Sequence, residues 1–279
     1  MRAPRGLWRP VVIAVPFAVL GVVFLYPLAL LAAEAFANPG GGYGLGTFAA
    51  ILAGPAFHDA LLATLRIALT ATAVCLLLGS ALALLVRFVA FRGARTLARM
   101  VDVYLAFPSF LVALSLTFLY GNSGFVRSLW LSTFGFAAAP AARSFLYGFW
   151  GVVLAEVTYY TPFVMRPLLA ALEVIDRSQL EVASSLGERP WGVLRRVLIP
   201  ELVPALIAGG SLCLLLTMNE FGIILVMGVK NVITLPMMIY GKAIDEFDYP
   251  AASAVAICNV ALSLALYFAY RQALERMPQ

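Results

Sequence analysis

Three charged residues lie inside long apolar stretches, where a charge is costly and therefore usually has a partner or a function. They are Arg66, Glu156 and Glu220. A guanidinium and two carboxylates have two chemical uses here: they can form an interhelical ion pair, or they can line a path for a polar solute. Tyr159, Tyr160 and Asn219 lie next to the carboxylates in the sequence and would join such a lining. Both uses remain open, and we expect Asn219 and Glu220 to line the path.

No group of side chains forms a recognisable catalytic set. The one histidine, His58, falls at the edge of an apolar run, and the three cysteines lie inside apolar runs with neither disulfide nor metal-ligand spacing. No G-x-x-x-x-G-K-[ST] run is present to bind a nucleotide phosphate. We therefore predict that the chain is not an enzyme, holds no metal or cofactor, and takes any energy it uses from another polypeptide.

The composition indicates that these residues lie in a membrane. Of 279 residues, 63% are hydrophobic and only 12% are charged. A soluble domain normally carries about twice that charged fraction, and one of this length could not bury so much apolar surface. The net charge of +5 does not indicate nucleic-acid binding, because the basic residues lie in short connections between apolar stretches. We predict an all-α polytopic membrane protein.

Six apolar runs are long enough to cross the hydrocarbon core as helices, which takes about 20 residues. The expected spans are Val11–Ala33, Ala60–Val86, Val103–Tyr120, Gly148–Ala170, Leu202–Val229 and Ala251–Tyr270. The first run exceeds a signal-peptide core and no small-residue cleavage pattern follows it, so we expect it to be retained. Since no internal repeat or soluble segment is visible, residues 1–279 are predicted to form one transmembrane domain.

Arginine and lysine predict the orientation, because they concentrate in cytoplasmic connections. Arginines cluster at both ends of the chain and in the second and fourth connections. The remaining connections carry Arg127, Arg143, Lys230 and Lys242. Both termini and the fourth connection are therefore predicted to be cytoplasmic. The three intramembrane charges then fall at a similar depth in the outer half of the membrane.

The fourth connection contains EVASSLGERPWGVLRRVLIP, the most polar run of its length in the chain. Just before it, Asp176 and Gln179 resemble an N-terminal capping box, and Gly187 suits a left-handed helix stop. A short helix is thus expected over Arg177–Leu186.

Proline organises the second half of this connection. Pro190 can open a second helix, because its missing N–H is no loss there, and Pro200 is expected to mark a break before the next span. Two short helices on the cytoplasmic side could dock in a groove of a partner. The alternative is a solvated connection with no partner.

The same run resembles the EAA loop of the permease subunits of binding-protein-dependent ABC importers. That motif has a glutamate, small residues, a glycine and a hydrophobic–x–Leu–Pro ending. The matching positions are Glu181, Ala183, Gly187, Val197, Ile199 and Pro200. The spacing is kept, and the departures at Val182, Val197 and Ile199 are apolar replacements. Ala63–Phe88 and Phe107–Gly124 also resemble the family, so the likeness covers about residues 60–270.

The resemblance implies a type I importer permease fold in the bacterial inner membrane, with residues 173–200 as a cytoplasmic coupling loop. It implies three protein partners: a dimer of cytoplasmic ATPase subunits that uses ATP, a second permease chain (a paralogue or a copy of this one), and a periplasmic solute-binding protein. In the family the loop passes the closure of the ATPase dimer to the spans. Glu181 would then contact the ATPase, and Gly187 would supply a turn where a side chain would clash.

The resemblance is closest to permeases for 2-aminoethylphosphonate, polyamines, ferric iron, thiamine and sulfate. The stretch from Thr217 to Pro250 is most similar to the 2-aminoethylphosphonate group. Carboxylates in the path would suit an ammonium group, and Arg66 would suit a phosphonate. The outer segments that would face the binding protein contain Arg127, Asp245, Glu246 and Asp248.

Two other classes compete with this interpretation. A transporter driven by an ion gradient would need no ATPase and should show paired repeats or interrupted helices around an ion site. A membrane-embedded enzyme would need a catalytic set of side chains. Neither class explains the spaced motif in the fourth connection.

Overall fold

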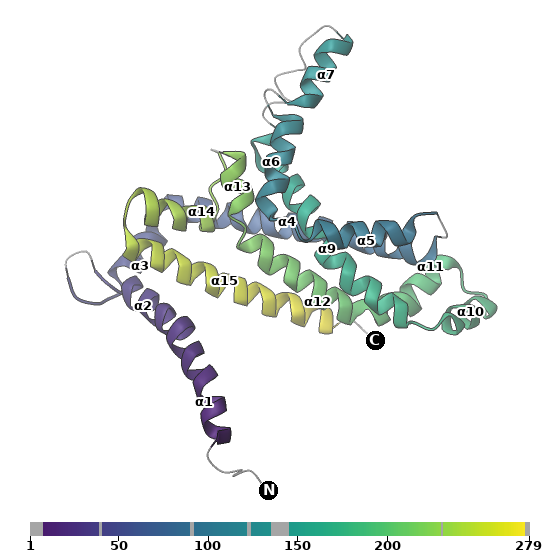
Figure 1. Ribbon diagram of the computed structural model, residues 1–279, viewed down its shortest axis with the longest axis horizontal. Coiled ribbons are helices and arrows are strands. Elements are labelled where there is room, and N and C mark those ends of the chain that lie inside the picture. Colours follow the sequence, from purple (N-terminus) through teal and green to yellow (C-terminus); the bar gives the residue numbers. More distant parts are fainter. Residues whose placement is uncertain are drawn as a thin grey trace. The chain divides into compact units, whose positions relative to one another are not determined.

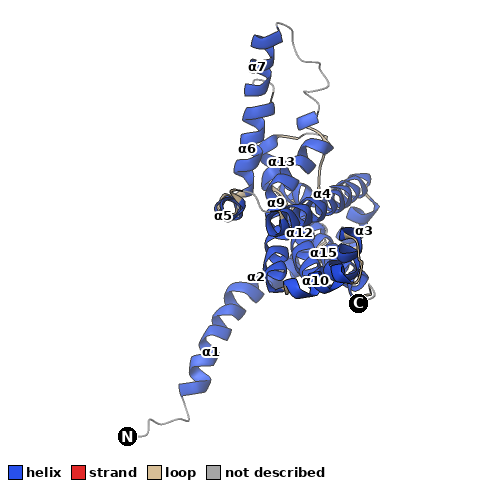
Figure 2. Ribbon diagram, turned by 90° about the vertical axis from the view of Figure 1, so that its right-hand side faces the viewer, coloured by secondary structure: helices blue, strands red, loops and turns tan. Residues whose placement is uncertain are grey.

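The computed structural model describes residues 8–38, 41–89, 92–121, 124–134, 145–229 and 231–276. Over these residues the chain is helical, and the one strand-like pairing there is an isolated bridge between Ala37 and Tyr43 (Figure 2). The all-α class expected from the composition is confirmed.

Figure 1 labels the described helices along the chain. In chain order they are α1 (Trp8–Leu20), the π-helical turn η1 (Gly21–Leu25), α2 (Tyr26–Ala35), α3 (Gly46–Ala53), α4 (Pro55–Phe88), α5 (Ala94–Tyr104), α6 (Ser109–Tyr120), α7 (Phe125–Phe134), α9 (Phe149–Val174), α10 (Arg177–Ser185), α11 (Pro190–Val193), the π-helical turn η2 (Leu194–Leu198), α12 (Ile199–Met218), α13 (Gly222–Met227), α14 (Leu235–Tyr240), the π-helical turn η3 (Gly241–Asp245) and α15 (Tyr249–Glu275). They form two compact units, one of Met1–His58 with Met238–Val260 and one of Asp59–Met237 with Ala261–Gln279. The one-domain prediction for 1–279 stays a prediction.

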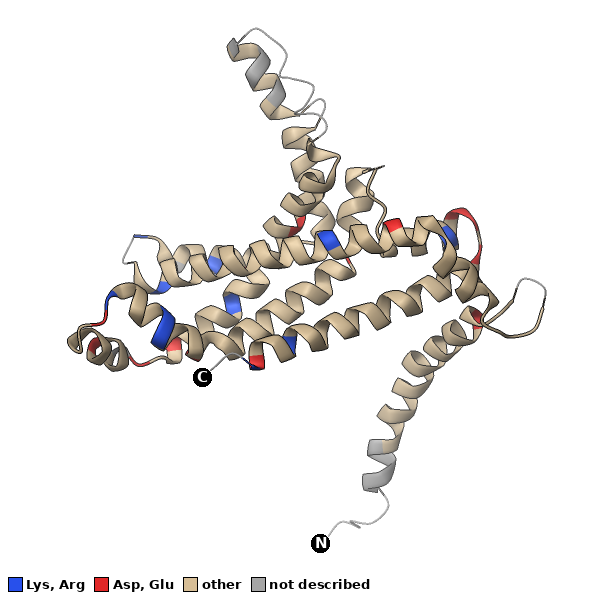
Figure 3. Ribbon diagram, turned by 180° about the vertical axis from the view of Figure 1, so that it is seen from behind, with Lys and Arg blue, Asp and Glu red and all other residues tan. Residues whose placement is uncertain are grey.

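Four helical stretches of the described chain are long and apolar enough to cross a membrane. They are Ala14–Ala35, Pro55–Phe88, Pro190–Met218 and Tyr249–Glu275, and a fifth is added if α5 and α6 count as one bent span. Charged residues are sparse along the length of α4, α12 and α15 (Figure 3). Helix α9 coincides with the expected fourth span, although it carries Glu156, Arg166 and Glu173.

The expected third span, Val103–Tyr120, is wrong as a continuous helix. Helix α5 ends at Tyr104, and the chain turns through 104° before α6 begins at Ser109. Pro108 has an extended backbone at this corner, and a proline also disfavours helical geometry in the residue before it. The proline therefore explains the turn.

The expected fifth span, Leu202–Val229, is also interrupted. Helix α12 ends at Met218, and α13 begins only at Gly222. Helix α13 in turn ends at Gly228, whose φ of 64° is left-handed. Non-helical backbone at membrane depth needs polar partners from the protein itself, and the break at residues 219–221 has them, as described below.

Helices α4, α9 and α12 form the core of the larger unit and meet at Val164 of α9. A Cβ on Gly79 of α4 would lie 3.0 Å from the Val164 side chain, and a Cβ on Gly209 of α12 would lie 3.0 Å from the Val164 Cα. Helices α9 and α12 lie side by side in the ribbon (Figure 1). Small residues let membrane helices approach this closely, and association then depends on packing rather than on the hydrophobic effect.

The first apolar helix has a different character. Within Ala14–Ala35, an 18-residue apolar stretch has none of its residues buried by the chain. Phe17, Val23 and Phe24 are each more than half exposed. This helix therefore presents apolar side chains to lipid or to another protein.

Some sequence predictions fall outside the described residues. Arg143 and Lys230 lie there, as do the first seven residues, and the side chain of Arg127 is also not described. The cytoplasmic placement of the two termini stays a prediction.

The close approach at Gly209 generates a first test. Gly209→Val would push a branched side chain into the backbone of α9, and we expect overpacking of this kind to cost about 1–3 kcal/mol. Ala208→Val, at the exposed position next to it on α12, should cost little. Thermal unfolding of the two purified variants in detergent measures the difference, and equal melting temperatures would contradict the packing described here.

Candidate functional site

Helix α10 has the caps that the sequence predicted. Asp176 accepts a hydrogen bond from the Ser178 N–H at 3.0 Å, which holds the pKa of the Asp176 carboxyl below its usual range. The stabilisation of the helix by this ionised cap is present at neutral pH. It is lost as the pH falls through the lowered pKa of Asp176. At the other end Gly187 has a φ of 87°, and the Glu188 N–H donates to the Ala183 carbonyl at 3.1 Å. The expected short helix is confirmed as Arg177–Ser185.

The second half of the connection differs from the prediction at Pro200. Pro190 opens α11 as expected, but the helix continues through η2 into α12, and Pro190–Met218 is one helical stretch. The expected break at Pro200 is therefore wrong. The π-helical turn explains this result, because the Ile199 N–H donates to the Leu194 carbonyl five residues back, and a local π-helical adjustment of this kind lets a membrane helix accommodate a proline.

The coupling loop, residues 173–200, has one face against the chain and one face exposed. Leu180, Leu194 and Leu198 pack on the core of the larger unit. On the outer face Leu186 is 81% exposed and Trp191 is 70% exposed. Of the motif residues, Glu181, Gly187 and Ile199 are exposed and Ala183, Val197 and Pro200 are half-buried. Large apolar side chains exposed on a short connecting segment, an aromatic one among them, are typical of a protein-docking surface.

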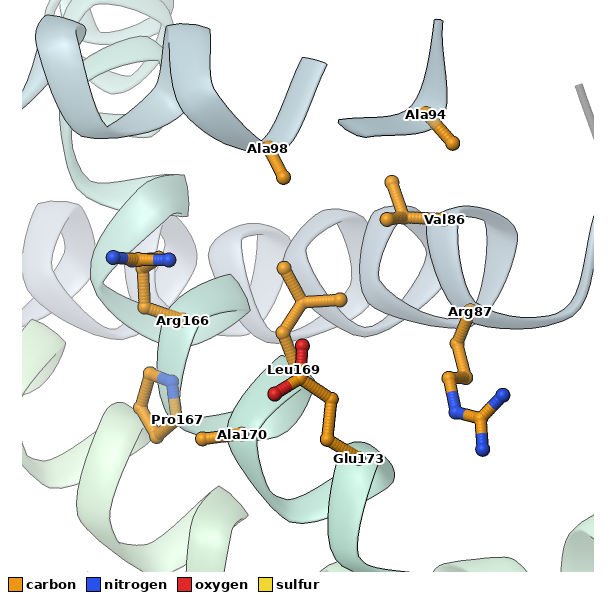
Figure 4. Close-up of a pocket in the computed structure, with 9 residues that line it drawn as sticks. All are labelled: Val86, Arg87, Ala94, Ala98, Arg166, Pro167, Leu169, Ala170 and Glu173. Carbon is orange, nitrogen blue, oxygen red and sulfur yellow. The ribbon is translucent and has the colours of Figure 1, made fainter. Parts of the chain in front are cut away.

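Polar contacts stabilise the coupling loop internally and hold the helix that leads into it. Within the loop, Arg196 of η2 forms an ion pair with Glu188. A cavity of about 680 Å³ lies between the ends of α4 and α9 and helix α5 (Figure 4). Two arginines line it: Arg87 donates from Nε to the Leu172 carbonyl at 3.0 Å, and Arg166 pairs with Asp102 at 2.6 Å. These contacts tie the end of α9, where the coupling loop begins, to α4 and α5.

A polar site occupies the break between α12 and α13. Glu220 is 6% exposed, and its Oε1 accepts the Ile223 N–H at 2.8 Å and the Ser109 hydroxyl at 3.4 Å. Its Oε2 accepts the Tyr160 hydroxyl of α9. One carboxylate thus satisfies the first turn of α13 and connects it to α6 and α9.

Of the other predicted path residues, Tyr159 lies next to this polar site, whereas Asn219 and Glu156 have different surroundings. Tyr159 stacks edge-on against Tyr160 and donates to the Phe107 carbonyl at 3.0 Å. Asn219 is exposed and donates to the Leu215 carbonyl at 2.8 Å and to Ser263 of α15 at 3.5 Å. Glu156, one helical turn before Tyr160 on α9, is fully buried, and neither of its oxygens has a hydrogen-bond partner in the described chain. Glu156, Tyr160 and Glu220 are all buried in this conformation, so their place in the path stays a prediction.

Arg66 lies apart from both carboxylates. The described residues contain four ion pairs, Arg166–Asp102, Arg196–Glu188, Lys242–Glu246 and Arg271–Glu275. Of the two uses left open, the ion pair of Arg66 with Glu156 or Glu220 is therefore not formed among the described residues in this conformation, and the path lining stays a prediction. Arg66 instead lines a separate cavity at the predicted outer end of α4, together with Asp59 and Asn231.

Sequence reasoning missed Ser109, Asp59 and Asn231. Ser109 follows Pro108 directly, and a serine after a proline inside an apolar run was a usable signal for an interruption. Asp59 lies seven residues before Arg66, on the same helical face. Asn231 is in a connection, and no pattern in the sequence relates it to α4.

Comparisons with known proteins agree with this arrangement. The chain matches the model of the binding-protein-dependent transport system inner membrane component family over residues 75–277. It is 49% identical over 269 residues to PhnU of Salmonella typhimurium, provisionally named a permease protein of a 2-aminoethylphosphonate transport system; the match covers 96% of this chain and 93% of PhnU. It is 34% identical over 182 residues to the sulfate transport system permease protein CysT of Escherichia coli. This match covers 64% of this chain and 62% of CysT.

A solved structure shows the same fold. The chain superposes with a TM-score of 0.73 on a chain of a bacterial ABC transporter involved in the import of the acidic polysaccharide alginate. The match covers 98% of this chain and 96% of that one, at 21% identity. A structure of a bacterial alginate ABC transporter bound to its pentasaccharide-loaded periplasmic protein gives a TM-score of 0.74 at 19% identity, over 94% of this chain and 92% of that one.

The polar site at the break generates a second test. Glu220→Ala would leave the Ile223 N–H and the Tyr160 hydroxyl buried without an acceptor, and we expect a loss of about 2 kcal/mol or more. Glu220→Gln keeps an acceptor for the N–H and should cost less. Glu201→Ala, at an exposed carboxylate in the first turn of α12, is the control. Thermal unfolding in detergent measures all three, and a Glu220→Ala variant as stable as the control would rule out this role.

Proposed function

The chain belongs to the family of binding-protein-dependent transport system inner membrane components, and on that basis we propose that it carries 2-aminoethylphosphonate across the inner membrane. It is a permease subunit of an ABC importer. The observation that supports the solute is the near full-length identity of 49% to PhnU. The similarity to the sulfate permease is lower and covers about two thirds of the chain, so sulfate is the weaker alternative, beside polyamines, ferric iron and thiamine.

Energy comes from ATP hydrolysed by a separate ATPase dimer, and this chain binds no nucleotide itself. The exposed face of the coupling loop, with Glu181, Leu186 and Trp191, supports this role because it offers apolar and charged contacts to a protein in the cytoplasm. Gly187 adds a specific feature. A Cβ on this residue would meet nothing within 4 Å in this chain, so a clash there can come only from a partner.

A second permease chain and a binding protein complete the importer. The exposed apolar helix within Ala14–Ala35 supports a contact with a second permease chain, since lipid is the only other apolar environment available to it. The binding protein delivers the solute to the outer side. Of the acidic residues predicted to face it, Glu246 pairs with Lys242 at 2.6 Å and Asp248 accepts the Ala251 N–H at 3.1 Å. Asp245 is exposed and is the stronger candidate for contact.

The gradient-driven transporter remains the alternative in a different class. Interrupted helices do occur here, at Pro108 and at residues 219–221, as such a transporter can show. The described residues contain no group of three or more metal-binding side chains at these breaks, and the coupling loop would have no use without an ATPase.

Substitution at Gly187 tests the coupling role. Gly187→Arg places a long side chain on the exposed face of the loop, and we expect the amount of ATPase that co-purifies in mild detergent to fall at least about tenfold. Gly93→Arg is the matched control, because Gly93 also has a positive φ, of 112°, and also has open space at its Cβ. If both variants retain their ATPase equally, the coupling surface lies elsewhere.

Uptake in whole cells tests the solute. In a strain that lacks the chromosomal copy, the wild-type chain should restore uptake of radiolabelled 2-aminoethylphosphonate, and Gly187→Arg should not. Unlabelled 2-aminoethylphosphonate should compete with the label, and sulfate, spermidine and thiamine should not. Restored uptake of sulfate in place of the phosphonate would overturn the proposed solute while leaving the permease role in place.

A further inference from the structure

A cavity of about 390 Å³ opens at the predicted outer end of α4. Its lining consists of Asp59, Leu62, Ala63, Arg66, Phe149, Asn231 and Val232. The volume is within the range of small-molecule sites, about 300–1,000 Å³. The composition is also typical of such sites, with an apolar wall and a few polar groups that converge on the space.

Buried contacts fix the wall of this cavity. Thr64, which is 3% exposed, accepts the Leu235 N–H on its hydroxyl at 2.8 Å and donates to the Ala60 carbonyl at 2.8 Å. Val229 and Val232 pack with Ile67 of α4 in one buried cluster. The connection that carries Asn231 is therefore held against α4 on both sides, and the cavity is a built part of the larger unit.

The two charges in the cavity are opposite in sign and are separated. Asp59 and Arg66 lie on the same face of α4, about 10 Å apart along its axis. Helical side chains lean toward the N-terminus, so the Arg66 guanidinium leans toward the level of Asp59. Neither residue belongs to any of the four ion pairs of the described chain. Asp59 and Arg66 thus line the same cavity without forming an ion pair with each other.

The location of Arg66 restricts what this space can be. Arg66 is exposed in this chain, yet it lies in a helix apolar enough to span the membrane. A charged side chain in such a helix faces water or protein rather than lipid, because exposure to hydrocarbon is costly. The face of α4 that carries Asp59 and Arg66 therefore borders the water-filled path or a second permease chain.

We propose that this cavity is a binding site for a zwitterionic solute on its way through the permease, with Arg66 holding an anionic phosphonate and Asp59 holding an ammonium group. A guanidinium binds phosphonate-like oxyanions through two parallel hydrogen bonds, and Asn231 adds an amide that can donate or accept. The site discriminates by carrying both signs of charge, so a solute with only one of them leaves the other residue without its partner. This inference rests on the proposed function and names the site at which it acts.

The direct test is 31P line broadening with two probes, 2-aminoethylphosphonate and ethylphosphonate, which lacks the amine. Each is added to the assembled transporter in lipid nanodiscs without the binding protein. Wild type should broaden 2-aminoethylphosphonate more than ethylphosphonate. Asp59→Asn should remove that difference, Arg66→Gln should abolish the broadening of both, and Arg66→Lys should restore part of it.

Arg271→Gln, an exposed arginine at the far end of α15, is the control and should behave as wild type. All substituted residues are exposed, so size-exclusion profiles should be unchanged. Wild-type broadening that persists in Arg66→Gln, or equal broadening of the two probes by wild type, would overturn the site.

Whole-cell uptake separates this failure from failure of the proposed function. If wild type imports 2-aminoethylphosphonate and Arg66→Gln imports it equally well, only the cavity assignment is wrong. If Arg66→Gln imports it at least about tenfold more slowly, as expected for a lost charge-assisted contact, the assignment is supported. A wild type that imports no 2-aminoethylphosphonate overturns the proposed solute together with the site.

Discussion

The carboxylate of Glu220 is the contact on which the arrangement of the membrane helices depends. It lies where α12 stops and α13 begins, and unpaired backbone groups at such a break cost several kcal/mol each in a bilayer. Glu220 accepts the Ile223 N–H and also the hydroxyls of Ser109 and Tyr160. One side chain therefore satisfies a backbone donor at the break between α12 and α13 and links this break to α6 and α9. The corner at Pro108 and the break at residues 219–221 are joined by a hydrogen bond, because the Ser109 hydroxyl donates to the Glu220 carboxylate.

Helices α9 and α12 connect this break to the coupling loop on the predicted cytoplasmic side. Helix α9 leads into the coupling loop and α12 leads out of it without a break, and the two pack closely where Gly209 faces Val164. Closely packed helices have low compressibility and transmit a displacement. Under the proposed function, a displacement of the coupling loop by an ATPase would reach Glu220 through the packing of α9 and α12.

The sequence predicted the class of the protein, the capped helix at Arg177 and the left-handed stop at Gly187, because these follow from local chemistry and from hydropathy. It did not predict the interruptions, although Pro108 and Ser109 gave a local signal for the first, because both interrupted runs are predominantly apolar and the polar partners of Glu220 lie far away in the sequence. The sequence could not decide between an ion pair and a path lining for Arg66, for a related reason. Depth along a helix can be counted from the sequence, but the direction in which a side chain faces depends on how the helices pack, and Arg66 faces the outer cavity. Pro200 was expected to mark a break before the next span, but the π-helical turn before it allows the helix to continue through the proline.

Hydrogen–deuterium exchange on the assembled transporter in nanodiscs tests the central claim most directly. Exchange in residues 177–198 and in residues 219–223 is compared with and without Mg-ATP, on an ATPase that binds but does not hydrolyse the nucleotide. We predict that exchange in the two segments changes together in wild type and that the change at residues 219–223 is absent in Gly187→Arg. A coupling loop that responds to ATP while residues 219–223 do not would contradict the mechanical connection between the loop and Glu220.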